Sequence, residues 1–458
     1  MMRRTFGSLG FVGDAPFEPR GPAGRPASGD GSTGPRLARR RPHCAYSTPL
    51  RIRKQSFAFG SSGLFRSRDF RLILLAYGIT HLGDDLALVA LTIRVADITG
   101  SGLLVSALLL ADLAPRLLLA PIGGLIVDRL ETVRVLVVAS IFQAGLAAAL
   151  AFVEAIPGVL VLSFLLGAVA AVSSPALFAL VPKASGEERV GQANARMELA
   201  RYVGGAVGPV LAGALSAGLG TRFALLVDAG TFLAIAACSA ALRLRRSPEP
   251  VAEGSPAPRA REGISFVRRD PVLLLTFVVL ALSVVFAAID NVAEVFFAKD
   301  VLDAGDLGYG ALLTAWILGM IVGATLTARR IPPEGLAPAI PIAAMAGGAA
   351  VAVAAGFPAF PLAVTMFVVG GAANGLENAG MRTLMHRRTP QALRGRVFAA
   401  YSGLLSAAQI AALGLGGVLV SLAGARGSLL VAGVGTLVIG GAGLVWYARV
   451  RPARGTPG

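Results

Sequence analysis

The sequence has few of the residues on which soluble enzymes and metalloproteins depend. Only 15% of its 458 residues are charged and its mean hydropathy is +0.71, whereas soluble domains carry about 25% charged residues. Its two cysteines, Cys44 and Cys238, lie far apart, and its three histidines are scattered. These shortages exclude a chain that is disordered throughout, a disulfide scaffold and most soluble enzymes, and they favour a multi-pass membrane protein.

Sequence motifs for catalysis and for nucleotide hydrolysis are missing as well. The chain has no HExxH, no GxSxG, no Walker motif and no cluster of His with Asp. HExxH is typical of zinc-dependent hydrolases, GxSxG of serine hydrolases, and a Walker motif of ATP-driven transporters. We therefore expect no enzyme activity, no cofactor and no metal site.

The first part of the chain differs in composition from the rest. Residues 1–71 hold 14 Lys and Arg against 4 Asp and Glu. We expect residues 1–65 to form a disordered basic tail, because this Pro-, Gly- and Ser-rich stretch has no long apolar run to bury. It lacks the apolar core of a signal peptide, while a transit peptide or a start codon assigned too early also fits. Any function of the tail would be contact with anionic lipid headgroups.

From about residue 70 the chain becomes a series of apolar runs, each long enough to cross a hydrocarbon core of ~30 Å. We expect transmembrane helices, because a helix satisfies its own backbone hydrogen bonds in lipid, whereas a barrel would show short alternating segments. The twelve expected spans are 70–96, 103–127, 133–153, 159–181, 200–219, 222–242, 271–297, 309–328, 338–357, 361–384, 397–423 and 428–449.

These runs divide into two similar halves. A polar, basic stretch at 243–270 separates six runs from six, and the spacing of Leu180 to Gly191 recurs from Leu384 to Gly395. Duplicated bundles place a substrate path at their interface, near the middle of the membrane. The sequence thus predicts an all-α membrane protein of two pseudo-symmetric six-helix bundles. Its expected parts are the bundles 66–243 and 270–450, a cytoplasmic linker 244–269 and a short cytoplasmic tail 451–458.

Basic residues indicate the orientation of the chain. Of its 42 Lys and Arg residues, 37 fall in the tail and on one alternating set of loops; the other five are Arg94, Arg116, Arg222, Lys299 and Arg426. Positively charged loops face the cytoplasm, so both termini and the linker are expected there, in a bacterial inner membrane. The net charge of +16 is then a topology signal, and no nucleic-acid partner is expected.

A motif follows the second run. Gly124, Asp128 and Arg129 stand in the order G-x-x-x-D-R, with Arg134 as the one further basic residue. This motif, in a chain of twelve runs in two halves, resembles the loop motif of the major facilitator superfamily. The resemblance implies a cytoplasmic gate, in which Asp128 pairs with a basic residue in one state and releases it in the other. An ordinary interfacial ion pair is the alternative.

A second motif lies in the fifth run. Gly204, Gly208, Pro209 and Gly213 are similar to the antiporter motif found in exporters of this superfamily. Glycine permits close helix packing, and a proline within a helix bends it. The alternative is a packing kink without a role in coupling.

Three short segments resemble one branch of the superfamily. They are Leu82-Gly83-Asp84 in the first run and two matching loop segments, Leu180-Val181-Pro182 and Leu393-Arg394-Gly395-Arg396-Val397. They are similar to enterobactin exporters and macrolide-efflux-like proteins, and the resemblance covers about 62–450. It implies the superfamily fold and transport by alternating access, with Asp84 at the branch's recurring aspartate.

Four ionisable residues are expected at mid-membrane depth. Asp84 and Asp85 lie roughly 20 Å into the first helix, and Arg116 lies roughly 18 Å from the inner end of the second, one turn from Asp112. Such groups are costly in lipid, so we expect them to face a wet space between the two halves. Three acids with one base favour a proton that is taken up and released as the gates alternate. A static ion pair between the two helices is the alternative.

Further acids extend this predicted proton-coupling and substrate cavity. Asp290 and Glu294 are one turn apart in the seventh run, and Glu377 lies in the tenth. Acids in a cavity favour cationic or zwitterionic substrates, although each of these residues is also consistent with a solvated or structurally paired role.

The predicted function is therefore proton-coupled efflux of small amphipathic molecules, drug-, macrolide- or siderophore-like. The expected partners are the substrate, protons and the lipid bilayer, and the expected state is a monomer. A proton-coupled importer of a small solute is the nearest alternative. A scramblase, sensor or membrane enzyme that uses the same bundle is the alternative of another class.

Overall fold

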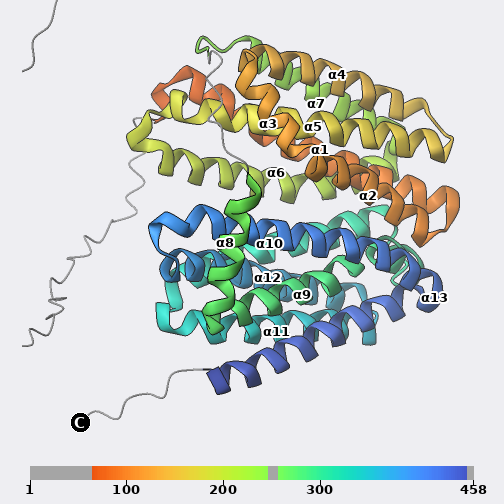
Figure 1. The fold of residues 1–458 in the computed structure, drawn as a ribbon. Coiled ribbons are helices and arrows are strands. Elements are labelled where there is room, and N and C mark those ends of the chain that lie inside the picture. The colour runs from red at the N-terminus through yellow and green to blue at the C-terminus, as the bar shows by residue number, and fades with distance from the viewer. Residues whose placement is uncertain (1–63, 246–255, 451–458) are drawn as a thin grey trace, which may run out of the picture. The chain divides into compact units, whose positions relative to one another are not determined.

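The computed structural model describes residues 64–245 and 256–450, and helices form all of the regular structure in these two ranges (Figure 1). The predicted disordered tail 1–65 thus lies outside the described residues, apart from Leu64 and Phe65. These two belong to a short 3-10 helix, η1 (Leu64–Arg66), in which Leu64 is buried. The predicted short tail 451–458 also lies outside.

The N-terminal lobe consists of seven α-helices in the described part. They are α1 (Arg68–Thr99), α2 (Gly102–Leu118), α3 (Ala120–Arg129), α4 (Thr132–Phe152), α5 (Ile156–Ser185), α6 (Val190–Leu219) and α7 (Thr221–Ala240). A 3-10 turn, η2 (Glu187–Arg189), precedes α6. Sharp turns separate several of these helices. Gly100 and Gly220 have φ of 59° and 83°, a backbone conformation that glycine adopts without strain.

The second predicted span is broken. α2 and α3 meet at Leu119 and are bent by 49°, where one continuous span over 103–127 was expected. Pro115 lies inside α2, and Pro121 lies in the first turn of α3. Each proline removes a backbone donor and clashes with the preceding turn, so the bend has a direct cause in the sequence.

The second half of the described chain forms the C-terminal lobe and a linker helix. Its helices are α8 (Pro256–Arg269), α9 (Pro271–Phe296), α10 (Gly305–Arg330), α11 (Leu336–Gly356), α12 (Phe360–Arg388) and α13 (Arg394–Val450). A π-helical segment, η3 (Phe297–Val301), continues α9, and two 3-10 turns, η4 (Pro333–Gly335) and η5 (Gln391–Leu393), precede α11 and α13.

Helix α13 contains two membrane spans. Gly424 interrupts its 57 residues with φ 68° and ψ 177°, which are not helical values, and this break falls between the expected runs 397–423 and 428–449. In the described part, ten helices are long and apolar enough to cross a membrane, and the bent pair α2–α3 makes eleven. The division of α13 at Gly424 brings the number to the expected twelve, which confirms the predicted all-α architecture.

Part of the predicted linker is helical. α8 packs Val267, which is buried, into an apolar cluster with Val397 and Tyr401 of α13. Gly263 allows a close approach, because a Cβ there would lie 2.4 Å from the carbonyl oxygen of Arg396. The linker therefore attaches to the C-terminal lobe, and the polar composition of the segment concealed an amphipathic helix.

The two lobes meet along two helix pairs, α6 with α10 and α2 with the first part of α13; Figure 1 shows α6 and α10 side by side. Small residues bring the backbones together, since a Cβ on Gly310 would lie 2.3 Å from the carbonyl oxygen of Pro209. Thr314 Oγ1 donates to the carbonyl oxygen of Ala206 at 2.8 Å, and Ser106 Oγ donates to that of Leu413. Close packing and interhelical hydrogen bonds are what hold helices together in lipid.

The bundle has two chemically different ends. At the end called basic here, α3, α10 and α12 finish on Arg129, Arg330 and Arg388. At the opposite end, called the far end, the chain turns at Gly100, Gly220 and Gly424. Large apolar side chains are exposed between these ends, as lipid contact requires; they include Phe142, Phe164, Leu318, Val322 and Val438.

Candidate functional site

A cavity lies inside the N-terminal lobe. Helices α1, α2, α4, α5 and α7 supply its walls, so every lining residue belongs to that lobe. Its polar lining residues are Asp84, Asp112, Arg116, Gln143, Ser163 and Asp228. Asp84, Asp112 and Arg116 were expected to share one depth, and the structure brings these three together.

Arg116 connects two helices in this cavity. Its Nη2 lies 2.8 Å from Asp112 Oδ1, one turn earlier on α2, and its Nη1 lies 3.4 Å from Asp84 Oδ2 on α1. The Arg116 side chain is 33% exposed and the two carboxylates are 19% exposed. The Arg116 guanidinium thus pairs with two acids, and its shorter contact is with Asp112 of its own helix.

Asp228 of α7 is a third acid at the same place, which the sequence did not associate with the other two. Its Oδ1 accepts from Thr231 Oγ1 at 3.1 Å, while its buried Oδ2 has no hydrogen-bond partner. A Cβ on Gly83 would lie 2.6 Å from Asp228 Oδ1, so α7 abuts the residue that precedes Asp84. Three carboxyls around one base make proton or cation uptake favourable in a cavity of low dielectric.

Asp85 faces away from this cavity. A Cβ on Gly205 of α6 would lie 3.1 Å from Asp85 Oδ2 and 3.6 Å from Ile317 of α10. Asp85 therefore lies toward the seam between the lobes. Successive helical residues point about 100° apart. Asp84 and Asp85 therefore lie at nearly the same depth but face different neighbours.

The glycines of the antiporter-like motif place α6 against both of its neighbours. Cβ atoms on Gly204 and Gly208 would lie 2.8 Å and 2.9 Å from carbonyl oxygens of α1, those of Gly78 and Leu82. A Cβ on Gly213 would lie 2.5 Å from the carbonyl oxygen of Asp306 at the start of α10. Pro209 lies inside α6, at the contact with Gly310 described above. The motif thus occupies the path from Asp84 and Asp85 to the C-terminal lobe.

The predicted gate motif lies at the end of α3, at the basic end. A Cβ on Gly123 would lie 2.0 Å from the carbonyl oxygen of Ala171 on α5, whereas a Cβ on Gly124 would meet nothing within 4 Å. The close approach therefore depends on Gly123, not on the motif glycine. Asp128 is half-buried and Arg129 is exposed.

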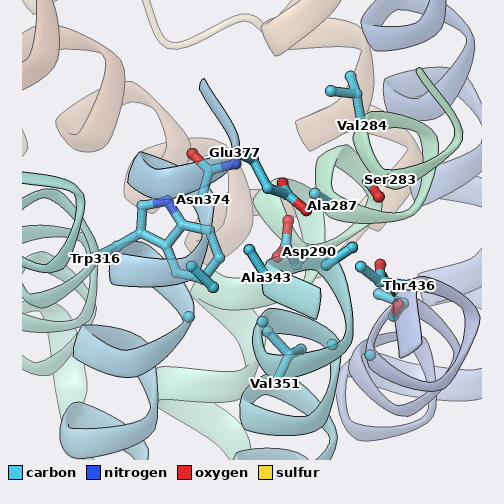
Figure 2. A pocket seen from close by; sticks show the side chains of 17 residues that line it. Ser283, Val284, Ala287, Asp290, Trp316, Ala343, Val351, Asn374, Glu377 and Thr436 are labelled. Atoms are coloured by element: carbon cyan, nitrogen blue, oxygen red, sulfur yellow. Dashed lines mark hydrogen bonds between the residues drawn. The ribbon is translucent and has the colours of Figure 1, made fainter. Parts of the chain in front are cut away.

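A second cavity lies inside the C-terminal lobe and is lined by Asp290 and Glu377, among other residues (Figure 2). Glu294 is buried one turn from Asp290 but does not line it. One acidic cavity between the halves was expected; the acids that line cavities here are instead divided between two, one inside each lobe. The depth of a residue follows from its position along the helix, but the direction of its side chain depends on the packing of five or more helices.

Ion pairs cross between the lobes near both ends of the described bundle. At the basic end, Glu198 of α6 pairs with Arg201 at 2.7 Å and lies 3.8 Å from Arg382 of α12. At the far end, Lys299 of the C-terminal lobe pairs with Asp97 of α1 and, at 2.7 Å, with Asp306. These cross-lobe pairs were not predicted from the sequence, because the two partners of each pair lie far apart in the chain and no local pattern connects them.

No group of three or more His, Cys, Asp and Glu that could hold a metal ion occurs in the residues the structure describes. His81 of α1 stacks edge-on against Tyr77, with ring centroids 4.6 Å apart. This contact gives His81 a packing role.

Comparison with known families gives one match that covers most of the chain. A family described as the Major Facilitator Superfamily matches residues 73–402. Among curated proteins, the chain is 26% identical to the uncharacterized MFS-type transporter YfiS of Bacillus subtilis, covering 82% of this chain and 93% of that protein.

Two further relatives have described activities. The chain is 28% identical to the multidrug efflux pump Tap of Mycolicibacterium fortuitum, over 81% of this chain and 93% of that protein. It is 24% identical to the enterobactin exporter EntS of Shigella boydii, over 89% and 98%.

Solved structures share the fold. A mutant of the nucleoside transporter NupG superposes with a TM-score of 0.70 at 10% identity, covering 83% of this chain and all (100%) of that one. A bacterial homologue of the human lysosomal transporter Spinster gives 0.65 at 15% identity, over 84% and 97%.

Proposed function

Because this chain belongs to the Major Facilitator Superfamily and is a multi-pass membrane transporter, we propose that it exports small amphipathic molecules in exchange for protons. The observation that carries the proposal is the network in which Arg116 holds Asp84 of α1 and Asp112 of α2. A half-buried network with more acids than bases, on two helices that can move relative to each other, is suited to coupling.

The proposed coupling step is a change of partner at Arg116. With a proton on Asp112, the guanidinium loses its closer contact, which spans 2.8 Å, and Asp84, now at 3.4 Å, becomes its remaining charged partner. That change tightens the contact between α2 and α1. Release of the proton restores the present arrangement. The protonation state of Asp112 therefore decides whether Arg116 pairs mainly within α2 or with α1.

The glycines of α6 carry this change to the other lobe. Gly204 and Gly208 pack on α1 within two turns of Asp84, and Gly213 packs on α10. A helix in backbone contact on both sides moves with both neighbours, because close-packed interfaces do not deform continuously. A shift of α1 against α2 therefore changes the α6–α10 seam between the lobes, as alternating access requires.

Export of amphipathic molecules has separate support. Tap is described as a multidrug efflux pump and EntS as an enterobactin exporter, and both align over most of their length. Asp85 lies at the α6–α10 seam, where an acid favours a cationic group on the substrate. The arginine-rich basic end is assigned to the cytoplasm, so the substrate enters there.

A screen for export activity tests this proposal. Cells stripped of their own pumps are given the chain, and their susceptibility to drugs and their retention of ethidium are measured with and without an uncoupler. We expect lower ethidium retention that the uncoupler reverses. Ethidium uptake that increases with the chain would indicate import, and no change for any compound would contradict a drug-export role.

A further inference from the structure

The cavity of the C-terminal lobe gathers oxygen atoms within otherwise apolar walls. Figure 2 shows the carboxyl groups of Asp290 and Glu377 directed toward the same space, with Ser283 and Asn374 close by. Thr436 of α13 adds another hydroxyl to the lining. The remaining wall is made largely of alanine and glycine residues.

Two of these oxygens lack a partner. Glu377 is 4% exposed and its Oε1 has no hydrogen bond, and Ser283 is 3% exposed and its Oγ has none. Buried polar atoms are almost always paired, and an unpaired one costs the full penalty of its desolvation. These atoms lie in a cavity that has space for a partner, which points to a bound species.

The charge of the cavity defines that species. No basic side chain lines it, and Arg382, five residues beyond Glu377 on α12, lies 3.8 Å from Glu198 of the other lobe. Two buried carboxyls without a base need positive charge or protons. The available donors are carboxylate and hydroxyl oxygens, which are ligands for hard cations.

We propose that this cavity binds one sodium-sized inorganic cation between Asp290 and Glu377, with Ser283 and Thr436 as neutral oxygen donors. One cation and one proton neutralise the two carboxyls. The cation takes the place that Arg116 occupies in the N-terminal cavity, where a guanidinium supplies the positive charge between two acids. The site is independent of the substrate and of the Arg116 network, so it does not depend on the proposed export activity.

Tryptophan fluorescence gives a direct reporter. The chain has two tryptophans, of which Trp316 lines the cavity and Trp446 does not. In a Trp446→Phe background, the full-length chain in detergent is titrated with NaCl against choline chloride at constant ionic strength. We expect a saturable change in Trp316 emission with Na⁺ and none with choline.

Variants assign the response to the cavity. Asp290→Asn and Glu377→Gln should weaken Na⁺ binding by about 100-fold or more, since loss of even an outer-shell partner of a metal site costs about 10–100-fold. Glu294→Gln is the comparison variant, because this buried acid lies one turn from Asp290 on the same helix but does not line the cavity, so its loss should weaken Na⁺ binding much less. Asp84→Asn should bind Na⁺ normally although it loses coupled export, which separates a failure of this site from a failure of the export mechanism.

Equilibrium binding of ²²Na⁺ to the unmutated chain provides a test that no variant's folding can obscure. We expect one bound ion per chain. No bound ²²Na⁺, a Trp316 response that follows pH but not Na⁺, or an equal loss in Glu294→Gln would each overturn the proposal.

Discussion

Arg116 Nη1 lies 3.4 Å from Asp84 Oδ2, and this contact joins α2 to α1 inside the N-terminal lobe, away from the seam between the lobes. A coupling site at that place acts on the lobe interface indirectly, through the helix that packs on α1. The glycines of α6 supply that connection, because they contact α1 on one side and α10 on the other.

Loss of the Arg116 charge is expected to destabilise the fold. Arg116→Gln leaves Asp84 and Asp112 without a base, and removal of one partner from a buried pair costs about 3–5 kcal/mol. The effect here should be smaller, because the Arg116 side chain is 33% exposed and solvent screens the pair. Thermal unfolding in detergent should show a lower midpoint for Arg116→Gln and partial recovery in Arg116→Gln with Asp112→Asn. A double variant less stable than the single one would contradict the pairing.

Close packing of α6 on α1 is expected to be essential for transport. A Cβ on Gly208 would lie 2.9 Å from the carbonyl oxygen of Leu82, so Gly208→Val forces the two backbones apart. Gly218→Ala on the same helix is the control, since a Cβ there meets nothing within 4 Å. Ethidium export should be lost in the first variant and kept in the second, at matched amounts in the membrane. Full export by Gly208→Val would rule out this contact as the connection.

The far-end ion pair of Lys299 with Asp97 is expected to favour the present arrangement of the lobes. Lys299→Met removes the cross-lobe contact, so a cysteine placed at Thr314 in the α6–α10 seam should react faster with a maleimide. The background replaces Cys44 and Cys238 by serine. Arg222→Gln serves as the control because Arg222 pairs with Glu154 within the N-terminal lobe. Equal labelling rates in all three proteins would show that the Lys299 pair has no such role.

The assignment of the basic end to the cytoplasm predicts the result of reporter fusions. A reporter enzyme fused after residue 255, in the segment that links the two halves of the sequence, should report a cytoplasmic location. A reporter inserted at Gly220 should report the opposite side of the membrane. The same side for both positions would mean that the predicted topology is wrong.

Much of the fold follows from the sequence because lipid restricts the possibilities. The apolar runs locate the helices, since every backbone group must be paired within its own segment. The same reasoning missed the break between α2 and α3, although Pro115 and Pro121 signal it, and it missed α8, whose helical pattern lies in a polar segment.

The candidate site was predictable in depth but not in direction. A fixed rise per residue places Asp84, Asp112 and Arg116 at one level, and the structure has them in contact. The rotation of each helix about its axis depends on its neighbours. That rotation separates Asp84 from Asp85, turns the three grouped residues into the lobe, and brings Asp228 to their cavity, none of which has a local signal in the sequence.

Gradient-driven transport by Asp84→Asn is the most direct test of proton coupling at the N-terminal cavity. Inverted membrane vesicles carry the wild-type chain or this variant. Accumulation of external ethidium is measured under an imposed pH gradient. In a second assay, exchange of labelled for unlabelled ethidium is measured without a gradient. We predict that Asp84→Asn loses the gradient-driven accumulation and keeps the exchange. Accumulation at the wild-type rate by a variant present in equal amount would contradict coupling through Asp84.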